Sequence, residues 1–386
     1  MNIGILTFHR AINYGAYMQA YSLANRLQKD FPQDKIEIVD YNHKKRENFI
    51  RKCPIVFLYR RSIKEGIEKY IQTKEFKRSL KYLNLSKRFL GCKNRDIEKY
   101  ISQRYDIIIV GSDAVFNWND IGIPNPYFLS ETKCRNKLSY AASAHLQKYN
   151  NISDTEKKYL TDALNDFCYI GVRDDNTAKF VDELLGITKA THNCDPSIFL
   201  KLDFSKMNLI KKLKKHKFNF NKKTVFVMLM NSQYGKFVKR FFGDEYQIVA
   251  LMDGNKYADI YLYNLNPFEW SHVFQYGNCL VTDYFHATIF GLKNGIPVMS
   301  IDASKYCSEE YESKAKDLLV SRLDLSLMYM PADRLEGENG YTRFKDKMTD
   351  ILNNYDNDKV DMKLKHEAES YNDFYKMVNM LHKESV

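Results

Sequence analysis

The stretch from Gly277 to Asp302, GNCLVTDYFHATIFGLKNGIPVMSID, constrains the fold more than any other part of the chain. A short apolar run of β-forming residues at 279–282 precedes a polar turn, and apolar residues then follow at helical spacing up to Asn294. Gly295 ends this helical pattern, and a second apolar run begins after Pro297. A strand, a tight turn, a helix, a glycine stop and a second strand in this order predict a βαβ unit.

The predicted βαβ unit has polar residues at its turn. Asp283 and His286 fall at the carboxyl end of a strand and in the first turn of a helix, which is the edge where open α/β sheets bind ligands. The amides of a helix N-terminus carry a partial positive charge and favour an anion, and a histidine there can hold or protonate a phosphate-bearing substrate. The alternative is that Asp283 caps the helix and His286 packs against the sheet.

The same alternation of strand and helix recurs along the 386 residues, a length that suits two domains. We expect strands at 2–8, 35–41, 105–111, 137–142, 168–173, 224–230, 246–252, 279–282 and 298–301, and helices at 16–27, 153–167, 267–276, 286–294, 313–323 and 359–381, with a further helix ending near 185. Ser153 and Glu156 form a capping box that predicts a helix start. The sequence therefore predicts an α/β fold of two Rossmann-like domains facing a central crevice, the GT-B-like arrangement.

The expected domain limits follow from changes in composition. Residues 1–200 form the first domain, with a basic helical insert at about 44–104. A lysine-rich crossing at 201–223 marks the boundary, so the second domain covers 201–358 and a C-terminal helix covers 359–386.

Polar residues also follow the predicted strands of the first domain. Asn13, Tyr14 and Gly15 lie in the first strand-to-helix turn, where glycine permits a tight turn. Ser112 and Asp113 follow the third strand, His145 the fourth, and Arg173 ends the fifth. Neither a Walker sequence nor a dinucleotide fingerprint occurs, so neither ATP nor NAD has motif support. The loop at 114–129 is rich in aromatics, asparagine and proline, which suits a substrate-facing loop or a surface cover.

Composition narrows the class of protein. A hydrophobic content of 44% and a charged content of 28% are typical of a globular protein. No apolar run has the length of a membrane span, and the N-terminal residues lack the layout of a signal peptide. The seven cysteines show neither CxxC nor Cys/His spacing, which argues against a disulfide framework and a zinc site. We therefore expect a cytoplasmic protein with reduced thiols.

The formal net charge of +11 is concentrated in one segment. Between Lys44 and Arg88 there are fifteen Lys/Arg and four Asp/Glu, so this segment carries a surplus equal to that of the whole chain. It suits a solvated face, the anionic inner face of a membrane, which the apolar patch at 54–59 would also contact, or nucleic acid. No nucleic-acid motif accompanies it, so we expect no nucleic-acid partner.

Six segments occur in one order along the chain: residues 7–23 (TFHRAINYGAYMQAYSL), 106–118 (DIIIVGSDAVFNW), 138–143 (LSYAAS), 172–175 (VRDD), 194–197 (CDPS) and 281–299 (VTDYFHATIFGLKNGIPVM). Together, and in this order, they resemble the polysaccharide pyruvyl transferase family over about residues 1 to 320. The segment at about 44–104 and the C-terminal tail lie outside the similarity. The resemblance implies a GT-B-like transferase that uses phosphoenolpyruvate to build a pyruvate ketal on a sugar of a capsule, exopolysaccharide or cell-wall polymer.

The resemblance also implies roles for residues. The family histidine corresponds to His286 and the family arginine to Arg173, whereas some members have an arginine where this chain has Tyr284. Lys314 and Lys316 are candidates to supply that charge. Asp113 is the candidate base beside the acceptor, with a loop cap as the alternative, and Asp283 is a cap and an orienting partner for His286. The expected substrate site is completed by Asn13, Tyr14, Gly15, Ser112, His145 and Phe285.

The expected partners are phosphoenolpyruvate as donor and a sugar acceptor, either free or part of a lipid-linked oligosaccharide, with no metal or organic cofactor. A GT-B glycosyltransferase that uses a nucleotide-sugar donor is one alternative. A non-catalytic sugar-binding component of polysaccharide assembly is another. The aromatic residues between Phe116 and Phe128 are compatible with all three, because aromatic faces stack on sugars.

Overall fold

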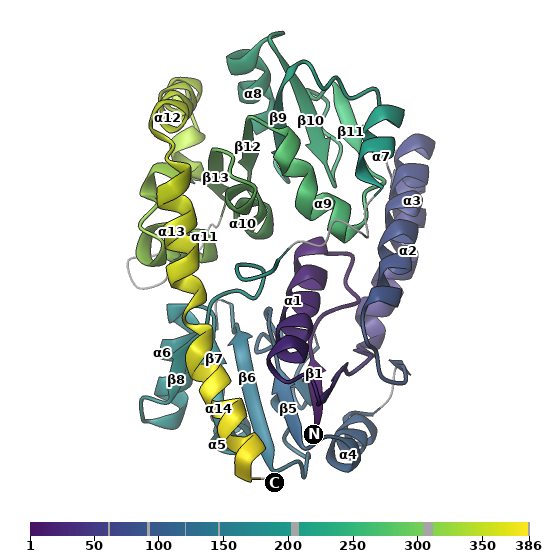
Figure 1. The fold of residues 1–386 in the computed structure, drawn as a ribbon, viewed down its shortest axis with the longest axis vertical. Helices are drawn as coiled ribbons and strands as arrows, with labels where there is room; N and C mark the ends of the chain where they lie inside the picture. The colour runs from purple at the N-terminus through teal and green to yellow at the C-terminus, as the bar shows by residue number, and fades with distance from the viewer. Residues whose placement is uncertain are drawn as a thin grey trace. The chain divides into compact units, whose positions relative to one another are not determined.

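The computed structural model describes residues 1–60, 62–90, 93–119, 121–145, 147–201, 208–303 and 312–384 (Figure 1). Arg61 of the basic segment, Asp120 of the aromatic-rich loop and part of the 201–223 crossing lie outside this description, as do the side chains of Pro54 and residues 57–59 of the apolar patch. The backbone contacts define two compact units. The first comprises 1–52, 80–200 and 368–386, and the second comprises 53–79 and 201–367.

The first unit is built on a six-stranded parallel sheet. Its strands are β1 (Asn2–Leu6), β2 (Lys35–Ile38), β5 (Ile107–Val110), β6 (Asn136–Ala142), β7 (Phe167–Val172) and β8 (Ala190–His192), in the order β2-β1-β5-β6-β7-β8. The registers pair Ile3 with both Ile36 and Ile107. The predicted strands are confirmed, although several are shorter than expected, and the short edge strand β8 is an addition to the prediction.

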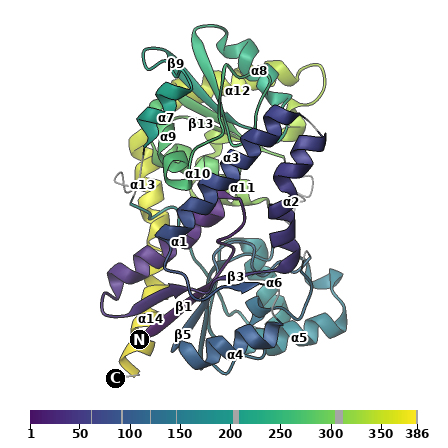
Figure 2. The same cartoon turned by 90° about the vertical axis from the view of Figure 1, so that its right-hand side faces the viewer.

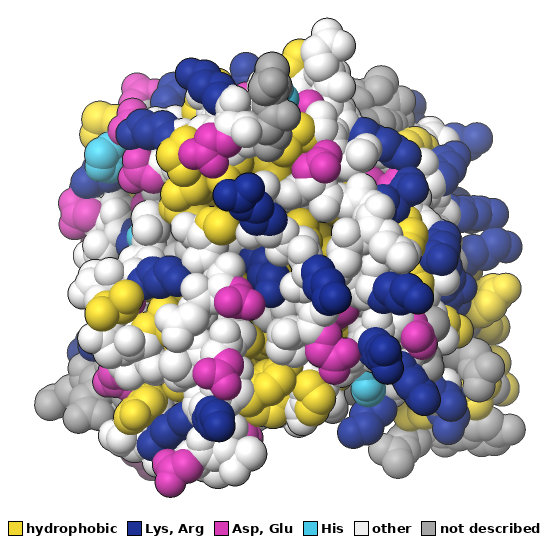
Figure 3. Space-filling model, turned by 90° about the horizontal axis from the view of Figure 1, so that it is seen from below, with side chains coloured by type: hydrophobic (Ala, Val, Ile, Leu, Met, Phe, Trp, Pro, Cys, Tyr) yellow, Lys and Arg dark blue, Asp and Glu magenta, His cyan; other side chains and the backbone are white. Residues whose placement is uncertain are grey.

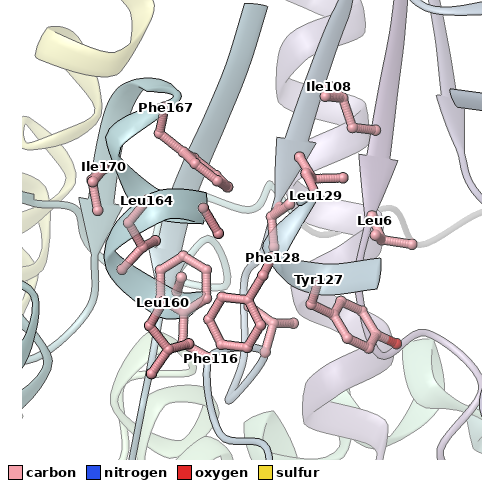
Figure 4. Packing of buried hydrophobic residues seen from close by; sticks show 14 of the residues in the cluster. Leu6, Ile108, Phe116, Tyr127, Phe128, Leu129, Leu160, Leu164, Phe167 and Ile170 are labelled. Atoms are coloured by element: carbon pink, nitrogen blue, oxygen red, sulfur yellow. The ribbon is translucent and has the colours of Figure 1, made fainter. Parts of the chain in front are cut away.

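Helices cover both faces of this sheet, which explains why a central strand such as β5 is apolar throughout. On one face a core forms with α4 (Asn94–Arg104), α5 (Asp154–Asn165) and α6 (Asp175–Leu185), and Figure 4 shows Leu160 and Leu164 of α5 beside Phe116 and Phe128. On the other face α14 (Tyr371–Glu384) lies beside β7 (Figure 1). The ring of Phe374 in α14 packs against that of Tyr140, with 4.7 Å between the ring centroids. The Ser153–Glu156 capping box is confirmed at the start of α5.

The second unit repeats this construction. The parallel strands β9 (Lys223–Met228), β10 (Tyr246–Leu251), β11 (Ile260–Leu262), β12 (Cys279–Thr282), β13 (Val298–Asp302) and β14 (Tyr329–Pro331) run in the order β11-β10-β9-β12-β13-β14. The helices are α3 (Ile63–Ser79), α7 (Leu209–Lys215), α8 (Tyr234–Phe242), α9 (Pro267–Val273), α10 (Phe285–Lys293), α11 (Lys314–Lys316), α12 (Gly340–Asn354) and α13 (Asn357–Ala368). The βαβ unit predicted at 277–302 is present as β12, α10 and β13, and Gly295 takes the left-handed φ of 71° after the helix.

Each sheet has one point where the chain reverses its direction of travel across the strands. In the first sheet the chain passes from β1 to β2 on one side and later adds β5 on the other, so the reversal lies between β1 and β5. In the second sheet the reversal lies between β9 and β12. Ligands of open α/β sheets bind at the carboxyl ends of the strands beside this switch point, which places a candidate site in each unit.

Two of the expected limits need correction. The C-terminal segment forms two helices instead of one, because the first helix ends at Ala368. Ser370, between the helices, accepts hydrogen bonds from the Cys194 amide (2.7 Å) and the Asn193 side chain (3.0 Å). The insert is not wholly helical, since β4 (Phe89–Leu90) pairs with β3 (Tyr41–Asn42).

The insert is also divided between the units. The contacts group residues 53–79 with the second unit, although the sequence analysis placed all of 44–104 in the first domain. The cause is a set of polar bonds from α3: Gln72 donates to the Met252 carbonyl at 2.8 Å, and Lys212 of α7 donates to Glu75 at 2.7 Å.

Charge is distributed unevenly on the surface as it is in the sequence. In the view from below (Figure 3), Lys and Arg side chains gather on the right-hand side and are mixed with Asp and Glu elsewhere. Within the described part of the chain, no helix combines the length and apolar character that a membrane crossing requires.

Candidate active site at the two switch points

Asp283 ties together the two strands that flank the second switch point. It follows β12, and its carboxylate accepts the Met230 amide at 2.9 and 3.0 Å and the Asn231 amide at 3.2 Å, both from the loop after β9. Burial raises the pKa of the Asp283 carboxyl, and the bonds from these amides oppose that rise. The expectation that Asp283 caps the next helix is wrong, because Tyr284 is the N-cap residue of α10 and the carboxylate is directed to the β9 loop.

Tyr284 connects α10 to a chain of acidic and basic side chains. Its hydroxyl donates to Asp253 at 2.6 Å, and the other oxygen of Asp253 lies 3.9 Å from the ammonium of Lys69. Burial, together with the negative charge of Asp253, raises the pKa of the Tyr284 hydroxyl well above its usual value. Lys69 belongs to α3, so the basic insert contributes a cation close to the start of α10.

His286 is the second residue of α10 and is half-buried. Its ring meets the Phe285 ring edge-on, with 5.2 Å between centroids. Two residues further along, the Thr288 hydroxyl lies 2.8 Å from that of Ser300 in β13, which fixes the first turns of the helix against the sheet. The predicted position of His286 in the first helical turn beside the switch point is confirmed.

Lys314 follows β13, the strand next to β12, and therefore belongs to the same edge of the sheet. The preceding residue, Ser313, caps α11 and donates to Asp302 at the end of β13. Lys316 lies 3.0 Å from Glu312, so this second candidate cation is engaged in an ion pair.

In the first unit, the residues after β1 start helix α1 (Tyr14–Asp30). Asn13 is exposed, and its side chain caps the helix by accepting the Ala16 amide at 3.2 Å. Tyr14 is buried, with 2% of its surface exposed. The expectation that Gly15 permits a tight turn is wrong, because Gly15 lies inside the first turn of α1.

Ser112 and Asp113 lie across the first switch point from α1. The Ser112 carbonyl accepts the Thr7 hydroxyl at 2.8 Å, which joins the ends of β1 and β5. Gly111 has a φ of 116°, and a Cβ there would lie 2.2 Å from the Tyr140 carbonyl oxygen, so only glycine fits. The Asp113 carboxylate accepts the amide of Ala114 at 2.8 Å, as expected of a loop cap, and its base role stays a prediction.

Arg173 is at the carboxyl end of β7, as predicted, and is buried in a polar cluster. Its guanidinium donates to Asp195 at 3.2 Å, and Asp195 also accepts the Gln19 side chain at 2.5 Å and the Ser197 hydroxyl at 2.6 Å. The Arg173 and Asp195 side chains are 5% and 1% exposed. This cluster joins β7, α1 and the segment after β8, a structural role that the sequence analysis did not anticipate.

His145 is exposed after β6, and its amide donates to the Ser143 hydroxyl at 3.1 Å. The sequence analysis missed one charged group of the first unit. Asp40, after β2, accepts bonds from Arg10 and from His9 (3.1 Å), which both follow β1. Burial opposes ionisation of Asp40, but the bonds from Arg10 and His9 hold the pKa of its carboxyl well below the usual value. The signal in the sequence was the position of each residue just after a strand.

The aromatic residues between Phe116 and Phe128 do not form the expected substrate-facing surface. Phe116, Trp118, Tyr127 and Phe128 are at most 5% exposed, and Phe116 stacks on Phe128 with 5.5 Å between centroids (Figure 4). The Trp118 indole donates to Glu156 at 3.2 Å. These rings fill the core of the first unit, so their faces are not available to a sugar.

The model of the family described as polysaccharide pyruvyl transferase matches residues 13–305, which is most of the chain. The chain belongs to the polysaccharide pyruvyl transferase family. The matched range contains every candidate residue that the sequence analysis named except Lys314 and Lys316, which lie beyond it. None of the curated protein sequences compared with the chain matches it significantly.

Two solved structures illustrate the similarity of fold. The UDP-GlcNAc 2-epimerase of Methanocaldococcus jannaschii aligns with a TM-score of 0.53 and 11% identity, over 95% of this chain and 99% of that one. S. aureus MnaA, in a co-structure with UDP, aligns with a TM-score of 0.51 and 10% identity, over 96% of this chain and 90% of that one. At these identities the likeness concerns the fold alone, so this pyruvyl transferase family member has a GT-B-like α/β fold.

Proposed function

We propose that this polysaccharide pyruvyl transferase moves the enolpyruvyl group of phosphoenolpyruvate onto a sugar of a surface polysaccharide or of its lipid-linked precursor. The observation that carries the proposal is the family match across residues 13–305. It is supported by the polar residues at both switch points, which are where α/β sheets bind their ligands.

The proposed reaction consumes two sugar hydroxyls and releases phosphate. A proton adds to the methylene carbon of phosphoenolpyruvate and leaves an oxocarbenium-like centre at the neighbouring carbon. One sugar hydroxyl bonds to that carbon and loses its proton, and the carbon–oxygen bond to phosphate breaks. The second hydroxyl then bonds to the same carbon and loses its proton, which closes the ketal. Phosphoenolpyruvate brings its own leaving group, so the proposal invokes no metal or cofactor.

His286 is proposed as the group that handles protons. Histidine is the side chain whose unperturbed pKa lies closest to neutrality, so it can both give and take a proton at physiological pH. Its place in the first turn of α10 puts it beside helix amides that favour the phosphate.

Two cations are proposed to hold the donor's negative charges. Arg173 has a planar fork of donors that suits a carboxylate or phosphate, and Asp195 fixes the orientation of that fork. Lys69 is proposed as the cation beside Tyr284, the position where some family members have an arginine. Its support is the short chain Lys69–Asp253–Tyr284, whereas Lys316 is engaged by Glu312. Lys314 is kept as a second candidate.

The acceptor is proposed to contact the first unit. Asp113 is the proposed base, and Asn13, Ser112 and His145 are the proposed polar contacts. Asn13 and His145 are exposed after β1 and β6, so their side chains are open to solvent where a sugar can approach.

A phosphate-release assay with phosphoenolpyruvate and a panel of sugar acceptors tests the proposal. We expect phosphate release that depends on one acceptor and a product heavier by one pyruvate ketal. Release of a nucleoside diphosphate from a nucleotide sugar would replace the proposal with a glycosyltransferase function. Acceptor binding with no turnover of either donor would replace it with a non-catalytic sugar-binding function.

A further inference from the structure

One exposed face of α3 combines apolar and basic side chains. Of the thirteen large hydrophobic side chains that are exposed among the described residues, five lie between Ile55 and Tyr70. Three of these belong to α3: Ile63, Ile67 and Tyr70 are 70%, 54% and 58% exposed. An isolated exposed apolar residue is ordinary, but a group of them on one element marks an interaction surface.

Helical spacing aligns these residues with the basic residues that follow. At 3.6 residues per turn, positions 63, 67, 70, 74, 77 and 78 fall on one side of the helix. The α3 stripe therefore consists of Ile63, Ile67, Tyr70, Lys74, Lys77 and Arg78, all exposed. Figure 2 faces the side on which α3 lies and shows the helix on the outside of the second unit.

The acidic residues of α3 compensate only part of the charge of the stripe. Glu68 is buried, with 9% exposed. The Glu75 carboxylate accepts hydrogen bonds from the Lys212 ammonium and from the Arg78 guanidinium, both at 2.7 Å. The Glu65 carboxylate accepts the hydroxyl of Ser62 at the start of the helix. The opposite face, which includes Gln72 and Phe76, is buried in the second unit. The stripe thus offers apolar side chains at one end and cationic ones at the other.

We propose that the α3 stripe binds the surface of an anionic lipid membrane. Ile63 and Ile67 would enter the boundary between headgroups and acyl chains, and Tyr70 suits that boundary because its ring is apolar and its hydroxyl is polar. Lys74, Lys77 and Arg78 would meet anionic headgroups, with their stems lying along the apolar region. Charge complementarity selects an anionic surface over a neutral one. This inference does not rest on the proposed function.

Vesicle sedimentation of the full chain tests this proposal. The probes are neutral vesicles of phosphatidylcholine alone and anionic vesicles of phosphatidylcholine and phosphatidylglycerol in equal parts. We expect binding to the anionic vesicles that weakens with added salt. Because each basic residue near such a surface changes the partition coefficient by about fivefold, the variant Lys74→Gln/Lys77→Gln/Arg78→Gln should bind about a hundredfold more weakly.

Two further variants separate the stripe from general surface properties. Ile63→Ser/Ile67→Ser/Tyr70→Ser should also lose vesicle binding, whereas Ile187→Ser/Ile210→Ser removes side chains that are 59% and 51% exposed elsewhere and should bind normally. Lys365→Gln/Lys376→Gln, which removes exposed charges from α13 and α14, should bind nearly as well as the unchanged chain. Circular dichroism checks that each variant is folded.

Equal sedimentation with neutral and anionic vesicles would overturn the proposal. So would normal binding by the Lys74→Gln/Lys77→Gln/Arg78→Gln variant. Concentration-dependent dimerisation that the Ile63→Ser/Ile67→Ser/Tyr70→Ser variant abolishes, without any vesicle binding, would show that a second copy of the chain covers the stripe instead.

Discussion

The two switch points have the same topology but hold their polar groups differently. In the first unit, charged side chains hold one another: Arg173 pairs with Asp195, and Arg10 pairs with Asp40, in both cases with little exposure of the carboxylate. In the second unit, Asp283 is held by backbone amides of the β9 loop instead of by a cation. A buried charge needs a partner. A cation that is paired with a buried carboxylate is partly occupied by it, whereas a carboxylate that is held by backbone amides occupies no cation.

This difference suggests a division of labour within the proposed function. The paired charges of the first unit stabilise the loops that follow its strands. The second unit presents the N-terminus of α10, His286 and the chain Lys69–Asp253–Tyr284 at its switch point. We therefore expect substitution of the paired charges in the first unit to lower the free energy of unfolding in addition to weakening substrate binding, and substitutions in the second unit to affect mainly turnover and donor binding.

The largest expected effect is that of His286→Ala. Loss of a positioned acid or base should lower the rate of phosphate release by about 10²–10⁴-fold, while phosphoenolpyruvate binding survives in part. His366→Ala, at an exposed position on α13 of the same unit, is the matched control and should keep normal turnover. Near-normal turnover of His286→Ala would show that this histidine is structural and that the second unit does not supply the proposed acid or base.

The next largest effect belongs to the first unit. Arg173→Ala leaves Asp195 buried without its cation, so the free energy of unfolding in urea should fall by about 3–5 kcal/mol. Lys376→Ala, which breaks the exposed pair with Asp373, should change it by no more than about 0.5 kcal/mol. Because Arg173 is also proposed to hold the donor, phosphoenolpyruvate binding should weaken as well. Unchanged stability together with lost phosphoenolpyruvate binding would remove the structural role of Arg173, and the contrast between the units would weaken.

Stability of the first unit should also depend on pH through Glu98 of α4. Burial raises the pKa of its carboxyl to about 7, although the Glu131 amide (2.6 Å) and the Thr132 hydroxyl (3.1 Å) bond to it. A raised pKa in the folded state means that the stabilisation is complete below the usual value of 4.5 and is lost as pH rises through about 7.

Unfolding free energies measured from pH 4 to pH 8 check this expectation. The shift corresponds to a loss of up to about 3 kcal/mol across the window. Glu98→Gln keeps the shape of the side chain and should remove this pH dependence without changing turnover. A variant with the same slope as the unchanged chain would assign the pH dependence to another group.

The smallest effect is expected at Lys69. Lys69→Ala should raise the KM for phosphoenolpyruvate about tenfold with little change in kcat, because an ion pair near a surface contributes modestly to ground-state binding. Lys69→Arg should restore part of the loss. Lys64→Ala is the control, since that side chain on the same helix is 85% exposed. Equal KM values for the two alanine variants would remove Lys69 from the donor site.

The sequence predicts the order of strands and helices because apolar runs such as 279–282 form buried strands. Short edge strands escape prediction: β8, β11 and β14 have three residues each, too few to show a period. Composition also misleads at Phe116 and Phe128, since an aromatic ring fits a core as well as a sugar site.

The positions of candidate residues were predictable, whereas their partners were not. Arg173 and His286 lie where strand and helix patterns place them, at the carboxyl edge of a parallel sheet. The tertiary fold brings Asp195 to Arg173, and it brings Lys69 to Asp253, the partner of Tyr284. No spacing in the sequence predicts these contacts. The charge of Lys69 in particular looked like part of a solvated segment.

The central claim is that phosphoenolpyruvate is the donor, and calorimetric titration of the full chain tests it most directly. We predict saturable binding of phosphoenolpyruvate without added metal, weakened in the Lys69→Ala variant but not in Lys64→Ala, and no comparable binding of a UDP-sugar. Saturable binding of the UDP-sugar with no heat from phosphoenolpyruvate would contradict the account and make the chain a nucleotide-sugar enzyme.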